Sequence, residues 1–136
     1  MTDLMAFSRS VLESQPFSVM IGAELEAFEP GRAVLALELG PDHMQHLGMA
    51  HGGVVSYLAD NALTFAGGSA LGAACVTLEF KINYIRPARS GRLVAEAKVV
   101  NAGKRFAVTE CRVTARENGE EILVASAQGT ICRLEA

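Results

Sequence analysis

Asp60 is the residue of this sequence that most needs a chemical explanation. It lies in a strongly apolar segment, and no Lys or Arg between His51 and Gly72 could pair with it. Ser56, Asp60 and Thr64 are spaced at i, i+4 and i+8, so on a helix they form one narrow polar line. Burying an unpaired carboxylate is costly. The pattern therefore indicates either a line that faces solvent or a functional carboxylate in a cleft.

The segment before this carboxylate offers groups that could hold an anion. His51, Gly52 and Gly53 lead directly into the predicted helix, so side chains do not screen the backbone N–H groups of its first turn. The helix dipole adds positive potential there. Such a terminus can bind an anion or stabilise an oxyanion on a carbonyl, although a Gly-Gly pair is often only a loop.

The separation of these two features constrains how they could act together. Asp60 follows Gly52 by eight residues, which is about 12 Å along a helix. A carboxylate that attacks a carbonyl, or holds a water beside it, must lie within about 3–3.5 Å of the reacting atom. We therefore expect the oxyanion donor and the carboxylate of one site to come from two copies of the helix, in a dimer.

The elements that would position these groups follow from hydrophobic periodicity and turn residues. Apolar residues cover most of the central helix, so a sheet must wrap around it, and we predict one α+β domain over residues 1–136. We expect a first helix over 4–12 that Pro16 stops, strands 23–29 and 32–39, a loop 40–53, a central helix 54–67 ended by Gly67-Gly68, and strands 75–86, 91–101, 104–117 and 120–133.

Composition excludes several classes of protein. The 136 residues are 50% hydrophobic and carry a net charge of −3, without the basic footprint of a nucleic-acid-binding protein. No apolar run approaches the ~20 residues of a membrane span, and residues 1–12 lack the apolar core of a signal peptide. Cys75, Cys111 and Cys132 are far apart and odd in number, so we expect reduced, mostly buried thiols in a cytoplasmic protein.

Other reactive side chains give weaker signals. His43, His46 and His51 fall close together, but their spacing fits no common metal motif, and we expect no metal. No Gly-x-Ser-x-Gly elbow is present, and Cys75 is more typical of a buried strand thiol than of a nucleophile. Basic residues gather in the turn regions of the strand-rich half and form either a solvated face or a phosphate site: Arg86, Arg89, Arg92, Lys104 and Arg105.

Residues 45–53, Gln-His-Leu-Gly-Met-Ala-His-Gly-Gly, followed by Leu58-Ala59-Asp60, resemble the signature of PaaI-type acyl-CoA thioesterases in the hotdog superfamily. The family pattern is Asn-x-x-Gly-x-x-His-Gly-Gly, with Asp nine residues after the His. Segment 77–87 with Gly91, and residues 125–130, also match in style, so the resemblance covers residues 15–133. It implies a long antiparallel sheet wrapped around the central helix, in a homodimer or a dimer of dimers that pairs such sheets.

The resemblance also implies roles by matching position. The Gly52 N–H would polarise the thioester carbonyl, while Asp60 of the other subunit would act as general base on water or as nucleophile. Thr77 would orient that water, and His51 would support the loop more as scaffold than as base. Gln45 stands where the family has Asn, and its extra methylene changes the reach of the amide. Further substrate contacts are expected from Gly53, Leu47, Met49, Tyr57 and Phe65, and CoA phosphate contacts from Arg86, Arg89 and Lys104.

The sequence therefore predicts hydrolysis of a small aryl-acyl or medium-chain acyl-CoA without a metal or redox cofactor. Two alternatives stay open. One is a hotdog dehydratase or hydratase acting on 3-hydroxyacyl or enoyl thioesters, since such enzymes pair a His with an acid and His51 is near. The other is a hotdog protein that binds an acyl-CoA without catalysis.

Overall fold

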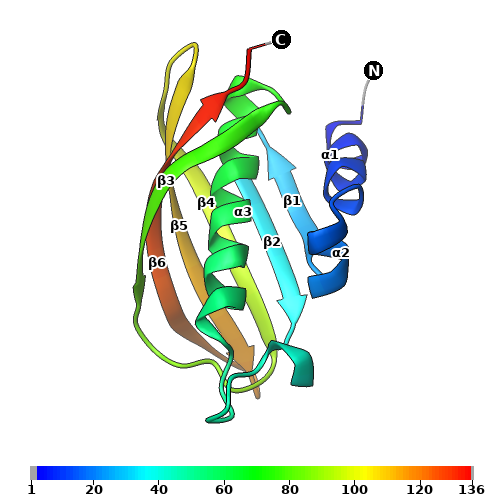
Figure 1. Cartoon of the computed structure of the whole chain (residues 1–136), viewed down its shortest axis with the longest axis vertical. Helices are drawn as coiled ribbons and strands as arrows, with labels where there is room; N and C mark the ends of the chain where they lie inside the picture. The colour runs from blue at the N-terminus through cyan, green and yellow to red at the C-terminus, as the bar shows by residue number, and fades with distance from the viewer. Residues whose placement is uncertain (1–2, 136) are drawn as a thin grey trace.

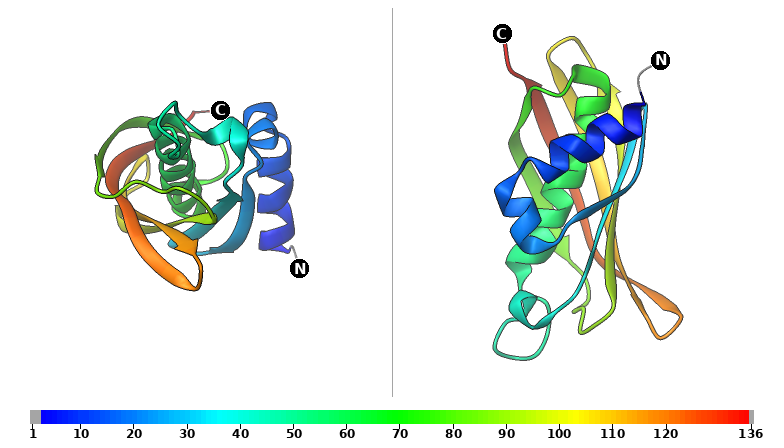
Figure 2. Two further views of the ribbon diagram at one scale, coloured as in Figure 1. Left: turned by 90° about the horizontal axis from the view of Figure 1, so that it is seen from below. Right: turned by 90° about the vertical axis from the view of Figure 1, so that its right-hand side faces the viewer.

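A computed structural model describes residues 3–135. Its six strands form one antiparallel sheet in the order β1-β2-β4-β5-β6-β3, and this sheet curves around the long helix α3 (Figure 1, Figure 2). The predicted α+β hotdog architecture is confirmed. The elements are α1 (Leu4–Glu13), α2 (Pro16–Ile21), β1 (Glu24–Glu29), β2 (Arg32–Glu38), the short 3-10 helix η1 (Pro41–His43), α3 (Gly52–Leu71), β3 (Cys75–Tyr84), β4 (Arg92–Ala102), β5 (Phe106–Glu117) and β6 (Glu120–Arg133).

Helix α3 forms the centre of the hydrophobic core. Leu58 and Leu63 are completely buried, and truncating a buried leucine to alanine costs about 2–5 kcal/mol. Ser56, Asp60 and Thr64 are only half-buried, because they lie on the side of α3 that the sheet leaves uncovered. The apolar positions that were expected to face the sheet are all buried: Val54, Val55, Leu58, Ala59, Ala62, Leu63, Phe65 and Ala66.

The central helix is longer than predicted at both ends. It runs through Gly67-Gly68, where the sequence pattern placed its end, and stops at Gly72 with a φ of 105°. A Cβ on Gly67 would lie 2.8 Å from the side chain of Ile131, so this glycine allows α3 to approach β6 closely. Tertiary packing therefore explains a glycine that resembled a helix terminator.

The N-terminal segment forms two helices where one was predicted. The Asp3 carboxylate caps α1 by accepting a hydrogen bond from the Ala6 N–H at 3.1 Å. Pro16 ends this first helical pattern, as expected, but it also occupies the first turn of α2. A proline is favourable there because its missing N–H would have no partner inside the helix.

One edge of the sheet is covered by a helix and the other is open. Helix α1 packs against the β1 edge (Figure 1). Strand β3 forms the other edge and exposes Val76 and Leu78, with exposed fractions of 40% and 56%. An open edge with apolar side chains is a ready template for pairing with another strand.

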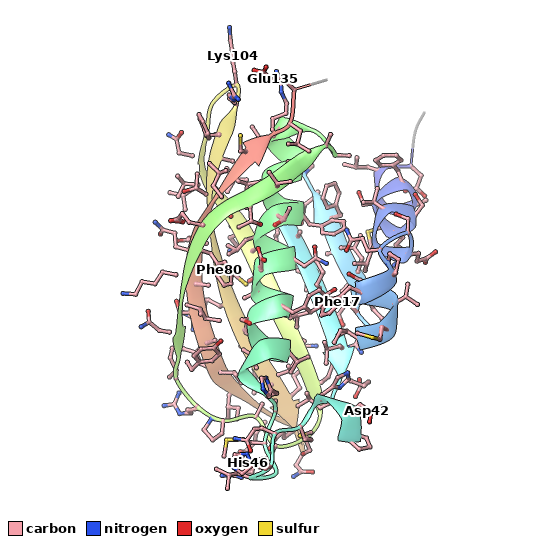
Figure 3. All side chains as sticks on the ribbon, in the orientation of Figure 1. Phe17, Asp42, His46, Phe80, Lys104 and Glu135 are labelled. Atoms are coloured by element: carbon pink, nitrogen blue, oxygen red, sulfur yellow. The ribbon has the colours of Figure 1, made fainter. Side chains whose placement is uncertain are left out.

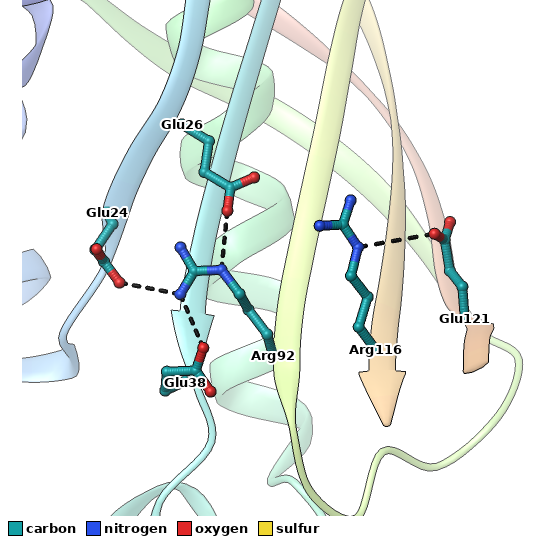
Figure 4. Close-up of polar contacts among 6 residues, drawn as sticks. All are labelled: Glu24, Glu26, Glu38, Arg92, Arg116 and Glu121. Atoms are coloured by element: carbon teal, nitrogen blue, oxygen red, sulfur yellow. Dashed lines mark hydrogen bonds and ion pairs between the residues drawn. The ribbon is translucent and has the colours of Figure 1, made fainter. Parts of the chain in front are cut away.

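Arg92 of β4 pairs with three acidic residues of the β1–β2 hairpin. Its guanidinium donates hydrogen bonds to Glu26 at 2.8 Å, Glu38 at 3.0 Å and Glu24 at 3.1 Å (Figure 4). Burial opposes the charged form, but these hydrogen bonds hold the pKa of Arg92 above its ordinary value. Arg92 is therefore a structural cation that ties β4 to β1 and β2.

Candidate active site

Asp60 is held by a chain of hydroxyl groups on the uncovered side of α3. The Thr77 hydroxyl of β3 donates to Asp60 Oδ1 at 2.7 Å. Thr77 Oγ1 also lies 2.7 Å from Thr64 Oγ1. The Thr64 hydroxyl also lies 2.8 Å from the backbone carbonyl oxygen of Asp60, so its one proton serves either this carbonyl or Thr77 Oγ1. Within residues 3–135, Asp60 Oδ2 has no hydrogen-bond partner, and none of the buried side-chain oxygens there lacks one, so Oδ2 is accessible to a ligand.

A β-bulge in β3 turns Thr77 toward α3. Pairing with β6 shifts between Thr77 and Glu79, which inserts one extra residue into β3. Phe80 and Ile82 pack against the core, and strict alternation from these residues would turn Thr77 away from it. Gly129 of β6 accommodates the bulge, because a Cβ there would lie 2.7 Å from the Glu79 carbonyl oxygen.

The start of α3 has one free donor. His51 is the N-cap, and its Nδ1 accepts a hydrogen bond from the Gly53 N–H at 2.8 Å. The Gly52 N–H has no acceptor among the described residues, while the Tyr84 hydroxyl donates to the Gly52 carbonyl at 3.1 Å. His51 thus caps the start of α3 and occupies the N–H of Gly53. The N–H of Gly52 is therefore free to donate to an acceptor outside the described chain.

A cleft of about 350 Å³ opens beside this helix start. Its lining includes Gln45, Met49, Gly52, Tyr84 and Arg86, so the structure brings together several of the residues that the sequence nominated. The Gln45 side-chain oxygen accepts the Leu47 N–H of its own loop, which leaves the amide NH₂ as the group able to reach a substrate.

A second cavity of about 350 Å³ lies between α1 and α3, close to the Asp60 cluster. Thr64, Phe65 and Cys75 are among the residues that line it. Two of the nominated substrate contacts lie elsewhere. Leu47 is 64% exposed at the tip of its loop. Tyr57 donates a hydrogen bond to Ser18 at 2.6 Å.

Tyr57 belongs to a polar network that sequence reasoning missed. Its ring packs against Phe17, with centroids 5.3 Å apart. The Asn61 side-chain nitrogen lies within hydrogen-bond distance of Gln15, Ser18 and Tyr57, which joins α2 to α3. The only sequence signal was the polarity of these residues, which gives no indication of their partners.

The basic residues that were nominated for the CoA phosphates lie at two ends of the molecule. Arg86 lines the cleft at the start of α3, and Arg89 lies a few residues further along. Lys104 is at the opposite end from the loop of His46 (Figure 3). Strand β4 joins the two ends, and its length separates Arg89 from Lys104 by about 30 Å. None of the ion pairs within residues 3–135 includes Arg86.

The three thiols and His43 have surroundings that indicate a structural role. Cys75, Cys111 and Cys132 are free, and burial raises the pKa of the half-buried Cys75 thiol, which disfavours the nucleophilic thiolate. His43 Nδ1 accepts from Gly40 N–H at 3.0 Å, and its Nε2 donates to the Ile21 carbonyl at 2.8 Å. His43 thus joins η1 to the end of α2. In the described range, His, Cys, Asp and Glu side chains nowhere gather in a group of three that could hold a metal.

Residues 47–122 match the thioesterase superfamily, and the chain belongs to this family of thioester hydrolases. A thioesterase family protein from Silicibacter pomeroyi has 30% identity and a TM-score of 0.88, with 96% of this chain and 99% of that chain covered. A mutant of the phenylacetic acid degradation protein PaaI from Thermus thermophilus has 35% identity and a TM-score of 0.78, with coverage of 88% and 100%. Human acyl-coenzyme A thioesterase 13 is 28% identical, with 84% of each chain covered.

No helix among residues 3–135 is long and apolar enough to cross a membrane.

Proposed function

We propose that the protein hydrolyses an acyl-CoA to the free acid and CoA. The observation that carries the proposal is the Asp60 carboxylate, which receives the Thr77 hydroxyl proton and keeps Oδ2 free on the uncovered side of α3. The free Gly52 N–H supplies the complementary oxyanion donor. Similarity to proteins described as an acyl-coenzyme A thioesterase and as PaaI supports the same substrate class.

The proposed reaction is a balanced acyl transfer to water. Asp60 takes a proton from water as the water oxygen bonds to the thioester carbon. The negative charge on the carbonyl oxygen is stabilised by the Gly52 N–H. Collapse breaks the C–S bond, and the CoA thiolate leaves with the proton held by Asp60. The route requires no metal or redox cofactor. Direct attack by Asp60 is the alternative, and incorporation of ¹⁸O from labelled water into the Asp60 carboxylate would reveal it.

The proposed site is shared between two subunits. Gly52 and Asp60 lie on the same continuous helix, separated by about 12 Å, so one protomer cannot direct both groups at one carbonyl. The open β3 edge, with its exposed Val76 and Leu78, supports a homodimer in which a second sheet joins there. Three free thiols favour a reducing compartment, so we also propose a cytoplasmic location.

Release of CoA, followed with a thiol reagent, tests the function. We expect the wild-type protein to release CoA from acyl-CoAs with turnover above the spontaneous rate. A hydratase would instead abolish the conjugated absorbance of an enoyl-CoA without releasing thiol, and a binding protein would do neither. His51 Nδ1 caps α3 by accepting the Gly53 N–H, so only Nε2 would remain for the acid–base role that a hydratase needs. Absence of thiol release over a broad set of acyl-CoAs would refute the proposal.

Arg86→Ala tests recognition of the CoA phosphates. Arg86 lines the cleft next to Gly52 without an ion-pair partner in the described chain. Loss of a guanidinium–phosphate contact should raise KM by about tenfold with little change in kcat. Steady-state kinetics on acyl-CoA, and on an acyl-pantetheine that lacks the nucleotide, measure the effect.

The matched control is Arg112→Ala, which removes the same charge from the exposed outer side of β5. This variant should leave KM unchanged. Equal rises of KM for acyl-CoA and acyl-pantetheine in Arg86→Ala would show that the residue does not bind the nucleotide.

A further inference from the structure

The cavity between α1 and α3 adjoins the proposed catalytic cluster at Thr64. Thr64 is part of its lining, and the Thr64 hydroxyl lies 2.7 Å from the Thr77 hydroxyl that holds Asp60. From there the lining continues along α3 to Phe65, Gly68 and Gly72. A thioester positioned at Asp60 would therefore direct its acyl group into this cavity.

The walls of the cavity suit a hydrocarbon. Helix α1 contributes Leu4, Phe7 and Val11, strand β1 contributes Phe28, and α3 contributes Phe65. Helix α1 packs against β1 and faces the cavity together with α3 (Figure 1).

Polar side chains of α3 in the same lining already make hydrogen bonds within the protein. The Ser69 hydroxyl donates to the Ala66 carbonyl at 2.6 Å and accepts the Gly31 N–H at 2.8 Å. The Thr64 hydroxyl is part of the Asp60 cluster. This wall therefore offers an acyl group mainly apolar contacts, as ligand pockets commonly do.

The length of the cavity sets a limit on the acyl chain. Thr64 and Gly72 are eight residues apart on α3 and its C-cap, a rise of about 12 Å. An extended carbon chain with bonds of ~1.5 Å advances by about 1.25 Å per bond, so roughly ten carbons span this distance. A linear acyl chain can extend over this distance, whereas a single aromatic ring is too short to do so.

Two adjacent glycines face different surroundings in this part of α3. Gly67 has no room for a side chain, because a Cβ would lie 2.8 Å from Ile131. A Cβ on Gly68 would meet one side-chain atom within 4 Å, Cys75 Sγ at 3.4 Å, which is the near limit of ordinary contact. The φ of Gly68 is not in the left-handed region. A helix is less stable with glycine than with alanine in its interior. Neither packing nor backbone conformation therefore explains why residue 68 is a glycine.

We propose that Gly68 sets the acyl-chain length of this enzyme by leaving the α1–α3 cavity open to a linear acyl group of up to about ten carbons. This inference rests on the proposed thioesterase function. A side chain at position 68 would project into the space that the distal carbons occupy. Gly68 is thus a specificity-determining residue that lies two helical turns from Asp60 and takes no part in the chemical step.

The test compares kcat/KM for butyryl-CoA and decanoyl-CoA in the wild type, Gly68→Ala and Gly68→Leu. We expect the wild type to prefer decanoyl-CoA. Gly68→Leu should lower kcat/KM for decanoyl-CoA by about tenfold or more and leave butyryl-CoA within about twofold, with a smaller loss in Gly68→Ala. Gly68→Ala should also raise Tm by about 3 °C, because alanine stabilises the helix interior.

Ala70→Leu is the control, because Ala70 is exposed on the same helix outside the cavity lining. It should leave the ratio of the two substrates unchanged. An unchanged ratio in folded Gly68→Leu and Gly68→Ala would overturn the assignment of the cavity, as would a wild type that prefers butyryl-CoA. Failure of the wild type to hydrolyse any acyl-CoA would instead overturn the proposed function.

Discussion

Asp60→Asn should lower kcat for acyl-CoA hydrolysis by about 1000-fold or more, because an amide cannot take a proton from water. The amide is nearly the same size as the carboxylate and can still accept the hydrogen bond that Thr77 donates at 2.7 Å. KM should therefore change little. Steady-state release of CoA, together with the circular dichroism spectrum and the Tm of the variant, measures the effect.

Asp42→Asn is the matched control, since Asp42 is an exposed carboxylate in η1. It makes the same chemical change and should retain wild-type activity. If a folded Asp60→Asn protein hydrolyses acyl-CoA within tenfold of the wild-type rate, Asp60 is not the base or the nucleophile.

Gly52→Pro should lower kcat by about 100- to 1000-fold, the effect expected for removal of one oxyanion donor. Proline removes the N–H itself, and position 52 is the first residue of α3, where proline is well tolerated. His51 precedes it with φ −61° and ψ 138°, a conformation that also suits the residue before a proline. No hydrogen bond within the described chain is lost, because the Gly52 N–H has no acceptor there.

Gly52→Ala distinguishes the loss of the N–H donor from the effect of adding a side chain. A Cβ at position 52 would lie 3.6 Å from the Tyr84 ring, which is ordinary contact, and the N–H is retained. This variant should keep activity within about tenfold of wild type. Equal activity of the proline and alanine variants would mean that the Gly52 N–H does not stabilise the oxyanion.

Much of the fold was predictable because its strongest sequence signals are local. Apolar residues on nearly every side of the central helix required a sheet around it, and Leu58 and Leu63 are completely buried as a result. The Asn118-Gly119 pair predicted a hairpin turn, and both residues adopt positive φ, 51° and 79°.

The features that escaped prediction depend on contacts between distant segments. Gly67 resembled a helix end, but its role is set by Ile131, which lies 64 residues later. The bulge that turns Thr77 toward Asp60 depends on Gly129 across the strand pair. Resemblance to a family nominated Thr77, yet the alternation of β3 alone would have turned it away from α3.

The sequence nominated the residues of the candidate site but did not indicate their arrangement. The sequence indicated that Gly52 and Asp60 are too far apart on one helix to share a carbonyl, and the observed helix retains that separation. It did not indicate that Gly53 is capped by His51, or that Thr64 completes the hydroxyl chain. Side-chain partners depend on tertiary geometry, which residue type alone does not define.

Subunit complementation tests the shared site most directly. Asp60→Asn and Gly52→Pro should each be nearly inactive alone. Mixing them under conditions of subunit exchange should unite an intact Gly52 with an intact Asp60 in one site of each mixed dimer. Random re-pairing makes half of the dimers mixed, each with one working site of two, so roughly a quarter of wild-type activity should return. Mass spectrometry of differently tagged subunits confirms the exchange. If mixed dimers form and activity stays at the level of the separate variants, both groups act within one chain and the shared site is wrong.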